Sequence, residues 1–154
     1  MLLSGKICVV TGAASERGLG MATAKLFAAH GAKVAILDLD LAASARAAAS
    51  IGAGLIGLAC NVLVNNAGIT QPIRTLDITP ANYDAVTDVS LRGTLYMSQA
   101  ALPAMVKQGS GSIVCISSVS AQRGGGFFGG PHYSAAKGGV LSLARAMARE
   151  FGPA

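Results

Sequence analysis

A glycine-rich loop between an apolar run and a helix-like segment, close to the amino end, constrains the fold of this chain most strongly. Residues 6–10 (KICVV) are rich in β-branched side chains, which is typical of a buried strand. Residues 21–30 are rich in alanine and predict a helix, which Gly31 ends. The glycines of the loop between them, residues 11–20 (TGAASERGLG), let the backbone approach a pyrophosphate, and the free N–H groups of the helix start favour its negative charge. The pattern predicts a phosphate-binding unit.

The next apolar run indicates which nucleotide this unit would bind. Residues 32–37 predict a second strand, which ends at Asp38, 18 residues beyond Gly20. A carboxylate at this place can accept hydrogen bonds from both hydroxyls of an adenosine ribose, and it repels a 2′-phosphate. Asp38 therefore favours NAD over NADP as the cofactor.

Tyr133 and Lys137 (YSAAK) form a pair that can move a proton, 15 residues after Ser118. Residues four apart on a helix lie on one face, so an ammonium can sit beside a phenol. A free phenol, with a pKa of ~10, is a poor proton donor or acceptor at neutral pH, but a neighbouring cation favours the phenolate. General acid/base chemistry then becomes possible. The YxxxK pattern is weak evidence by itself, and its value depends on the motifs around it.

The order of the motifs resembles that of the short-chain dehydrogenase/reductase family along the whole chain. The motifs are the glycine loop at 11–20, Asp38, NNAG at 65–68, Ser118 and YSAAK at 133–137. The resemblance implies a fold of the α/β class, a Rossmann-type doubly wound parallel sheet flanked by helices. It also implies an enzyme that uses NAD or NADP to transfer a hydride between the cofactor and a secondary alcohol or ketone.

The resemblance also implies roles for single residues. Tyr133 would donate or accept the proton, Lys137 would hold the nicotinamide ribose and tune the tyrosine, and Ser118 would bind the substrate oxygen. Both Tyr133 and Lys137 would thus contact the cofactor, and Asn61 and Val62 would lie near the adenine. The other residues expected at the cofactor belong to the glycine loop and the NNAG motif: Gly12, Ser15, Arg17, Gly18, Leu19, Gly20, Asn65, Ala67 and Gly68.

The glycine loop departs from the family pattern in length and charge. Five residues separate Gly12 from Gly18, two more than in the TGxxxGxG loop that is usual in similar proteins. We therefore expect Glu16 and Arg17 to bulge out. An arginine at the place of Arg17 occurs in some relatives that prefer NADP, which opposes the indication from Asp38. We give Asp38 more weight, because a carboxylate repels a phosphate directly whereas an arginine in a longer loop can turn to solvent.

The expected proton relay departs from the family pattern as well. Ser90 stands where similar proteins have an asparagine that is thought to bend a helix and to hold a water. A hydroxyl can donate and accept, so Ser90 is a weaker catalytic candidate. The stretch from Ser118 to Tyr133 is about two residues longer than is common in the family, so Ser120 is an alternative for the serine role.

A crossover segment is missing from the expected sheet. Residues 57–62 predict a third strand and residues 63–66 the end of a fourth, with nothing between them. Parallel neighbours need a connection of about a dozen residues or more, usually a helix. We therefore expect a single dinucleotide-binding and catalytic domain over residues 1–154, with a chain gap between Val62 and Leu63 and a truncation after Ala154.

Two long helices complete the predicted organisation. One covers residues 80–107, with Thr79 as its N-cap, and the other covers residues 133–151. Similar proteins assemble through these helices, so we expect a homodimer or homotetramer. Residues 110–116 predict a strand whose carboxyl end delivers Ser118.

The glycine-dense residues 124–131 are expected to border the substrate cavity. Phe127 and Phe128 would form an apolar wall there, or the loop would be mobile. His132 precedes Tyr133 and is expected to be a partly exposed histidine at the start of the second long helix; contact with the substrate is the alternative.

Composition excludes other classes of function. The net charge is +5, but the twelve lysines and arginines are scattered, so we expect no nucleic-acid partner. Apolar runs stop well short of the ~18 residues of a membrane span, and the amino end lacks the apolar core of a signal peptide, so we expect a cytoplasmic protein that binds no membrane. Cys8, Cys60 and Cys115 fall in predicted strands without ligand-like spacing and predict buried thiols, not a metal site.

A second class of function stays open, a non-catalytic dinucleotide-binding module or redox-state sensor. Ser90 and the apparent deletions favour it. The intact set of Ser118, Tyr133 and Lys137 argues against it, because a binding module has no need for all three.

Overall fold

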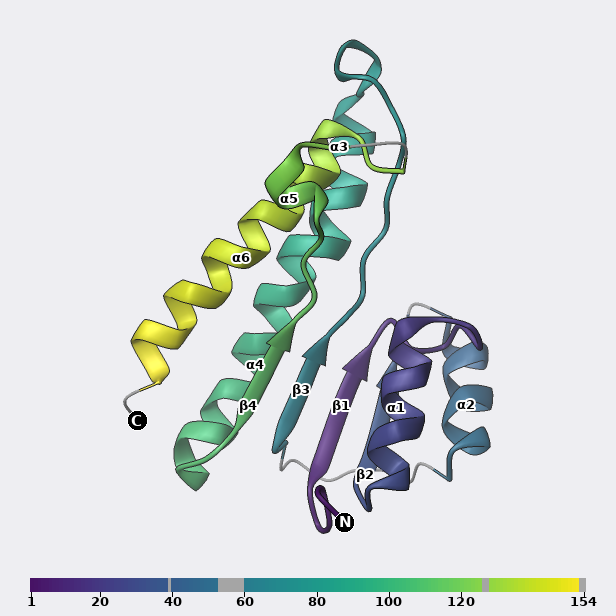
Figure 1. Ribbon diagram of the computed structural model, residues 1–154, viewed down its shortest axis with the longest axis vertical. Coiled ribbons are helices and arrows are strands. Elements are labelled where there is room, and N and C mark those ends of the chain that lie inside the picture. Colours follow the sequence, from purple (N-terminus) through teal and green to yellow (C-terminus); the bar gives the residue numbers. More distant parts are fainter. Residues whose placement is uncertain (39, 53–59, 126–127, 153–154) are drawn as a thin grey trace. The chain divides into compact units, whose positions relative to one another are not determined.

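The computed structural model describes residues 1–38, 40–52, 60–125 and 128–152, and the chain divides into two compact units (Figure 1). The first unit contains Met1–Ala67 and Ser98–Val114. The second contains Gly68–Met97 and Cys115–Ala154. The glycine loop therefore belongs to the first unit, and the Tyr133–Lys137 pair to the second.

A parallel sheet with the strand order β2-β1-β3-β4 is the centre of the first unit (Figure 1). Its strands are β1 (Ile7–Thr11), β2 (Lys33–Leu37), β3 (Val62–Asn65) and β4 (Ser112–Cys115). β1 pairs in parallel with both of its neighbours, so that Cys8 lies opposite Val34 of β2 and Val62 of β3. Most buried strand residues are apolar, as is typical of parallel sheets: Cys8, Val10, Val34, Ile36, Leu63 and Val64. The buried polar residues Thr11 and Asn65 end β1 and β3. The predicted α/β class and the strands at 6–10, 32–37 and 110–116 are confirmed, with boundaries shifted by up to two residues.

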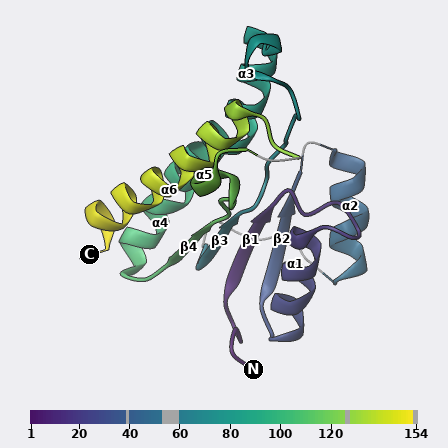
Figure 2. The same cartoon turned by 45° about the horizontal axis from the view of Figure 1, so that its top comes forward.

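Two helices of the first unit, α1 (Leu19–Ala29) and α2 (Leu41–Ser50), lie side by side (Figure 2). α1 packs against β1 and β2, and α2 packs against β2. Gly31 has a φ of +89° after the end of α1, the left-handed conformation expected of a glycine that stops a helix. Asp40 is the N-cap of α2, and its carboxylate accepts a hydrogen bond from the N–H of Ala43 at 2.8 Å.

The second unit is helical. Its elements are the 3₁₀ turn η1 (Thr75–Asp77), α3 (Pro80–Thr87), the π-helical segment η2 (Asp88–Arg92), the first turn of α4 (Gly93–Gln108), α5 (Ser120–Arg123) and α6 (Pro131–Phe151). α3, η2 and α5 pack against α6, and Figures 1 and 2 show α5 beside the first turns of α6. The helix predicted over 80–107 is confirmed as a continuous helical stretch from Pro80 to Gln108, but the π-helical segment divides it into α3 and α4.

The predicted boundary between the third and fourth strands is wrong at Val62. Residues 57–59 lie outside the described residues, and Asn61 precedes β3. Val62 is the first residue of β3 because residues 62–64 form one apolar run that pairs along β1. The expected chain gap between Val62 and Leu63 stays a prediction.

The cysteines differ in their burial. Cys8 is fully buried in β1, whereas Cys60 precedes β3, outside any strand, and Cys60 and Cys115 are half-buried. Each is a free thiol. Burial raises the pKa of Cys8 and of Cys60, so both are neutral thiols at neutral pH. In the described ranges, no helix is long and apolar enough to cross a bilayer, and no three His, Cys, Asp or Glu residues gather as a metal site.

Replacing Thr79 by alanine should lower the free energy of unfolding by about 1 kcal/mol, because the side chain caps α3. Thr79 Oγ1 accepts from the N–H of Asn82 at 3.2 Å, and Asn82 Oδ1 accepts from the N–H of Thr79 at 3.1 Å. Urea denaturation followed by circular dichroism measures the change. Thr79→Ser keeps the hydroxyl and should stay within about 0.5 kcal/mol of the wild type. Equal losses in the two variants would contradict a capping role.

Candidate functional site

Two glycines allow the loop at 11–20 to pack closely in the first unit. Gly12 has a φ of +63°, and a Cβ atom there would lie 2.7 Å from Ala67 Cα. A Cβ atom on Gly20 would lie 2.6 Å from Asn66 Nδ2 and 2.7 Å from Gly12 O. Side chains cannot approach backbone this closely, so both positions require glycine. Gly18 is the N-cap of α1 and offers no side-chain hydrogen bond, so the first N–H groups of α1 have no capping side chain.

A network of hydrogen bonds joins this loop to the end of β3. Asn66 Nδ2 donates to Thr11 O at 3.0 Å and to Gly12 O at 2.9 Å. Thr11 Oγ1 accepts from the N–H groups of Asn66 at 3.1 Å and Ala67 at 3.0 Å. Asn65 is buried, and its Nδ2 donates to Ser98 Oγ at 3.1 Å. Asn66 was not among the residues expected to contact the cofactor, and its side chain binds the backbone of the loop.

Asp38 lies beside the same loop. Its Oδ2 accepts a hydrogen bond from the N–H of Ala14 at 3.0 Å, and the residue is exposed. The N–H of Gly12 donates to Leu37 O at 2.8 Å, which ties the loop to the end of β2. An exposed carboxylate is therefore held at the loop, where the sequence predicted it.

Asn61 and Val62, predicted near the adenine, do not lie at this end of the sheet. Asn61 Oδ1 accepts from the N–H of Ile7 at 2.9 Å, and Val62 lies opposite Cys8. Both residues are therefore at the amino end of β1, whereas the glycine loop follows its carboxyl end. The prediction treated Val62 as the carboxyl end of one strand, but it is the first residue of β3, so the placement near the adenine is corrected.

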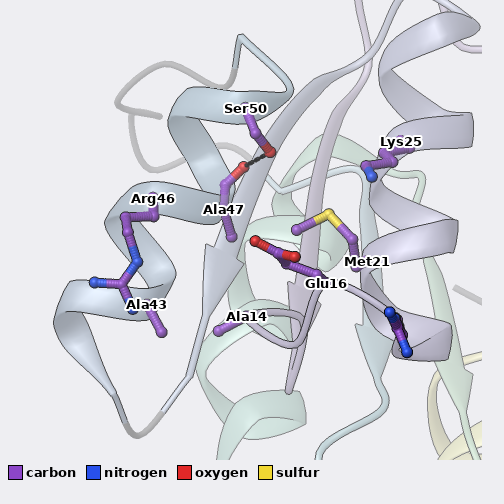
Figure 3. Close-up of a pocket in the computed structure, with 9 residues that line it drawn as sticks. Ala14, Glu16, Met21, Lys25, Ala43, Arg46, Ala47 and Ser50 are labelled. Atoms are coloured by element: carbon purple, nitrogen blue, oxygen red, sulfur yellow. Dashed lines mark hydrogen bonds between the residues drawn. The ribbon is translucent and has the colours of Figure 1, made fainter.

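A cavity of about 350 Å³ lies beside the glycine loop, between α1 and α2 (Figure 3). Figure 3 shows Glu16 reaching in between the two helices, with Arg46 on the side of α2 and Lys25 on the side of α1. Arg17 also lines the cavity and is exposed. The lengthened loop therefore carries charges of both signs, as its sequence indicated.

Tyr133 and Lys137 share one face of α6. Lys137 Nζ lies 6.0 Å from the centroid of the Tyr133 ring, within the range of a cation–π contact. The lysine is only 3% exposed, and its Nζ donates to Ile116 O at 2.7 Å. Burial lowers the pKa of Lys137 because it disfavours the ammonium, and nearby Cys115 opposes this shift. A buried cation thus lies one turn from the phenol.

Three serines lie on the segment that follows β4. Ser117 Oγ donates to Lys137 O at 2.8 Å, and Ser118 Oγ accepts from the N–H of Ser120 at 3.1 Å. Ser120 is buried near the tyrosine, since a Cβ atom on Gly129 would lie 3.4 Å from Ser120 Oγ and 2.8 Å from Tyr133 Cδ1. Ser118 and Ser120 therefore both stay candidates for the serine that binds the substrate oxygen.

Ser90 lies in the π-helical segment and is fully buried. Its Oγ donates weakly to Ile69 O at 3.5 Å, and its carbonyl accepts from Thr94 Oγ1 at 3.0 Å. A Cβ atom on Gly68 would lie 3.1 Å from Lys137 Nζ and 3.5 Å from Ser90 Oγ. Gly68 therefore brings the backbone close to both polar groups. π-Helical segments occur often at functional sites.

His132 is buried, which corrects the prediction of partial exposure. The residue is 2% exposed in the first turn of α6, and its Nε2 is 3.3 Å from Gln71 Oε1, on the segment around residue 71. Phe128 is exposed, whereas Phe127 lies outside the described residues. Whether these two residues form an apolar wall stays a prediction.

Comparison with known proteins gives consistent matches. The profile of the family described as short chain dehydrogenase matches residues 57–154. An uncharacterized short-chain type dehydrogenase/reductase of Sinorhizobium fredii is 53% identical, with 99% of this chain and 71% of that protein covered. An acetoacetyl-CoA reductase of Synechocystis is 39% identical, with 96% and 66% covered. A solved structure of a short chain dehydrogenase/reductase family protein has a TM-score of 0.91 at 36% identity, with 99% and 71% covered.

The chain is shorter than the proteins that it matches. It spans about two thirds of the Synechocystis protein. The alignment with the Sinorhizobium protein runs over 180 positions although the chain has 154 residues, so at least 26 aligned positions have no counterpart here.

Replacing Lys137 by methionine should remove a pH dependence of stability. Because burial lowers the pKa of Lys137 in the folded protein, the unfolded chain binds more protons in the window from that lowered value up to the ordinary value of 10.5. The contribution of Lys137 to the free energy of unfolding should therefore rise with pH across this window and be constant below it. Urea denaturation of wild type and variant at stepped pH measures the difference in slope. Lys107→Met, at an exposed lysine, is the matched control and should keep the wild-type slope; a wild-type slope in Lys137→Met would contradict the assignment.

Proposed function

Because this chain belongs to the short-chain dehydrogenase/reductase family, we propose that it transfers a hydride between a nicotinamide cofactor and a secondary alcohol or ketone. Proteins of this family are oxidoreductases that use NAD or NADP. The observation that carries the proposal is the buried Lys137, whose ammonium lies one turn from the phenol of Tyr133. A buried cation is unfavourable for stability alone, so its place beside a proton-transferring side chain supports a catalytic role.

The first unit fits the phosphate and ribose groups of a dinucleotide. Gly12 and Gly20 have no Cβ atoms, so a pyrophosphate could approach the backbone there. The N-cap Gly18 offers no side chain to the first N–H groups of α1, so these groups could donate to the pyrophosphate. Asp38 would accept the hydroxyls of the adenosine ribose, and its charge favours NAD. The cofactor, when bound, would supply or accept the hydride.

The second unit supplies the proton chemistry. In the oxidation of an alcohol, deprotonated Tyr133 would accept the hydroxyl proton, and in the reverse direction its phenol would donate it. Lys137 uses one of its three N–H groups on Ile116 O, which leaves two that could bind ribose hydroxyls. Its charge would favour the phenolate.

The hydroxyl of Ser118 can donate a hydrogen bond, which is what orienting a substrate oxygen requires. Its Oγ already accepts from the N–H of Ser120, so its own hydrogen is available to donate to a substrate oxygen. Ser120 is the alternative, because it is buried close to the tyrosine ring. Ser90 would act less directly, through the backbone at Ile69.

A non-catalytic dinucleotide-binding module or redox-state sensor is the second candidate. The absent counterparts of at least 26 aligned positions favour it, because we propose that they include the crossover that the predicted sheet lacks. Calorimetric titration with NAD and NADP, followed by absorbance assays over secondary alcohols and 3-oxoacyl thioesters, separates the two. Binding without turnover on any substrate supports the sensor.

Replacing Tyr133 by phenylalanine should lower kcat by about 10²- to 10⁴-fold, the usual contribution of general acid/base catalysis. NAD affinity should be nearly unchanged, because the ring and its packing are kept. Steady-state assays and calorimetry measure the two effects, and Tyr83→Phe, at an exposed tyrosine of α3, is the matched control. Unchanged turnover in Tyr133→Phe refutes the acid/base assignment.

Replacing Asp38 by asparagine should weaken NAD binding by roughly 10- to 100-fold and strengthen NADP binding. The amide oxygen can still accept from the N–H of Ala14, so the loop is kept while the negative charge is lost. The expected size is that of hydrogen bonds to a charged group. Calorimetry with each nucleotide measures the change in preference. Asp84→Asn, at an exposed carboxylate of α3, controls for net charge; an unaltered NAD to NADP ratio in Asp38→Asn would show that another group decides the cofactor.

A further inference from the structure

His132 is a buried polar residue that the proposed chemistry does not use. It immediately precedes Tyr133 on α6 and is 2% exposed, and its Nε2 lies 3.3 Å from Gln71 Oε1. The amide oxygen can only accept, so this contact needs the hydrogen on Nε2. Nδ1 is buried, and it has no hydrogen-bond partner within the described part of the chain. An apolar side chain would fill this space without such an unsatisfied atom, so the contact with Gln71 is the feature that a histidine adds.

Two further hydrogen bonds join the same segments of the second unit. The N–H of Gly130 donates to Gln71 O at 3.0 Å, and Thr70 Oγ1 donates to Phe128 O. A Cβ atom on Gly130 would lie 2.7 Å from Gln71 O, so the two backbones are in close contact. Residues 70–71 are thus fastened to residues 128–132 at three points, which we name the 70–132 clamp.

The clamp bears directly on the tyrosine ring. Gly129 lies between the anchored residues Phe128 and Gly130, and a Cβ atom on it would lie 2.8 Å from Tyr133 Cδ1. The backbone at Gly129 therefore packs against the Tyr133 ring. If the hydrogen bonds on either side of Gly129 were lost, this backbone would be free to shift, and the phenol would lose its fixed orientation.

We propose that His132 is a positioning residue that holds Tyr133 in its reactive orientation through its hydrogen bond to Gln71. This inference rests on the proposed function, since it concerns the residue that exchanges the proton. The segment that His132 fastens follows the NNAG motif at 65–68 directly along the chain. Proton transfer needs a close approach of fixed geometry, so a loosened tyrosine lowers kcat more than it changes KM.

Kinetics of three variants tests the role of the donor. His132→Leu removes it, Gln71→Met removes the acceptor, and His132→Gln places an amide N–H near the position of Nε2. We expect kcat to fall by about three- to tenfold in the first two, the worth of one hydrogen bond, with the KM values for substrate and cofactor nearly unchanged. His132→Gln should recover kcat to within about twofold, and the double variant His132→Leu/Gln71→Met should lose no more than the worse single variant. Equal losses in His132→Leu and His132→Gln, or additive losses in the double variant, overturn the proposal.

A second measurement needs no substrate. In protein labelled with ¹³C at the tyrosine rings, Tyr133→Phe assigns the Tyr133 signal, and the exposed Tyr83 and Tyr96 serve as internal references. The Tyr133 signal should move in His132→Leu and Gln71→Met but stay in place in His132→Gln, while the reference signals stay in place in all variants and show that they are folded. A Tyr133 signal unmoved in His132→Leu overturns the proposal. If the Tyr133 signal moves in His132→Leu but the wild-type protein turns over no substrate, the proposed function is rejected while the positioning role of His132 is supported.

Discussion

The contact between the ends of β1 and β3 is the constraint on which the first unit depends. Asn66 donates to Thr11 there through both its backbone N–H and its side-chain amide, and the amide also donates to the carbonyl of Gly12. These bonds satisfy polar groups where the chain leaves the sheet, which would otherwise be costly to bury. They are possible only because Gly12 and Gly20 have no Cβ atoms. The same two glycines that would admit a pyrophosphate therefore also let the loop close on β3.

Burial of a cation is the corresponding constraint in the second unit. Lys137 places its ammonium on Ile116 O, and its own carbonyl accepts from Ser117 Oγ. The lysine is thereby tied to the segment that carries Ser118. Gly68 completes the surroundings, because a Cβ atom there would lie only 3.1 Å from Lys137 Nζ. Lys137 Nζ and Ser117 Oγ thus each donate to a backbone carbonyl, as buried polar groups require.

The sequence predicted those features that depend on local preferences. Thr79 and Pro80 mark the start of α3, Gly31 ends α1, and the spacing of Tyr133 and Lys137 places both on one face of α6. Each follows from dihedral angles or helix periodicity within a few residues.

The predictions that were wrong depend on segments far apart in the chain. His132 was expected to be partly exposed from its place at a helix start, but it is buried and contacts Gln71, 61 residues earlier. Asn61 and Val62 were placed near the adenine, but the pairing of β3 with β1 puts them at the other end of the sheet. No local pattern in the sequence contains either pairing.

By itself, the sequence determined the places of β1, β2, β4, α1 and α6 and the chemical groups available to a cofactor and a proton. Backbone preferences and side-chain chemistry are local properties, so short stretches of sequence are enough to predict them. Only the tertiary structure decided that β3 lies beside β1, that the Asn66 amide meets the glycine loop, and that His132 binds Gln71. Strand register and buried hydrogen bonds join residues that are distant in sequence, so they are set by which packing satisfies the most apolar and polar groups at once.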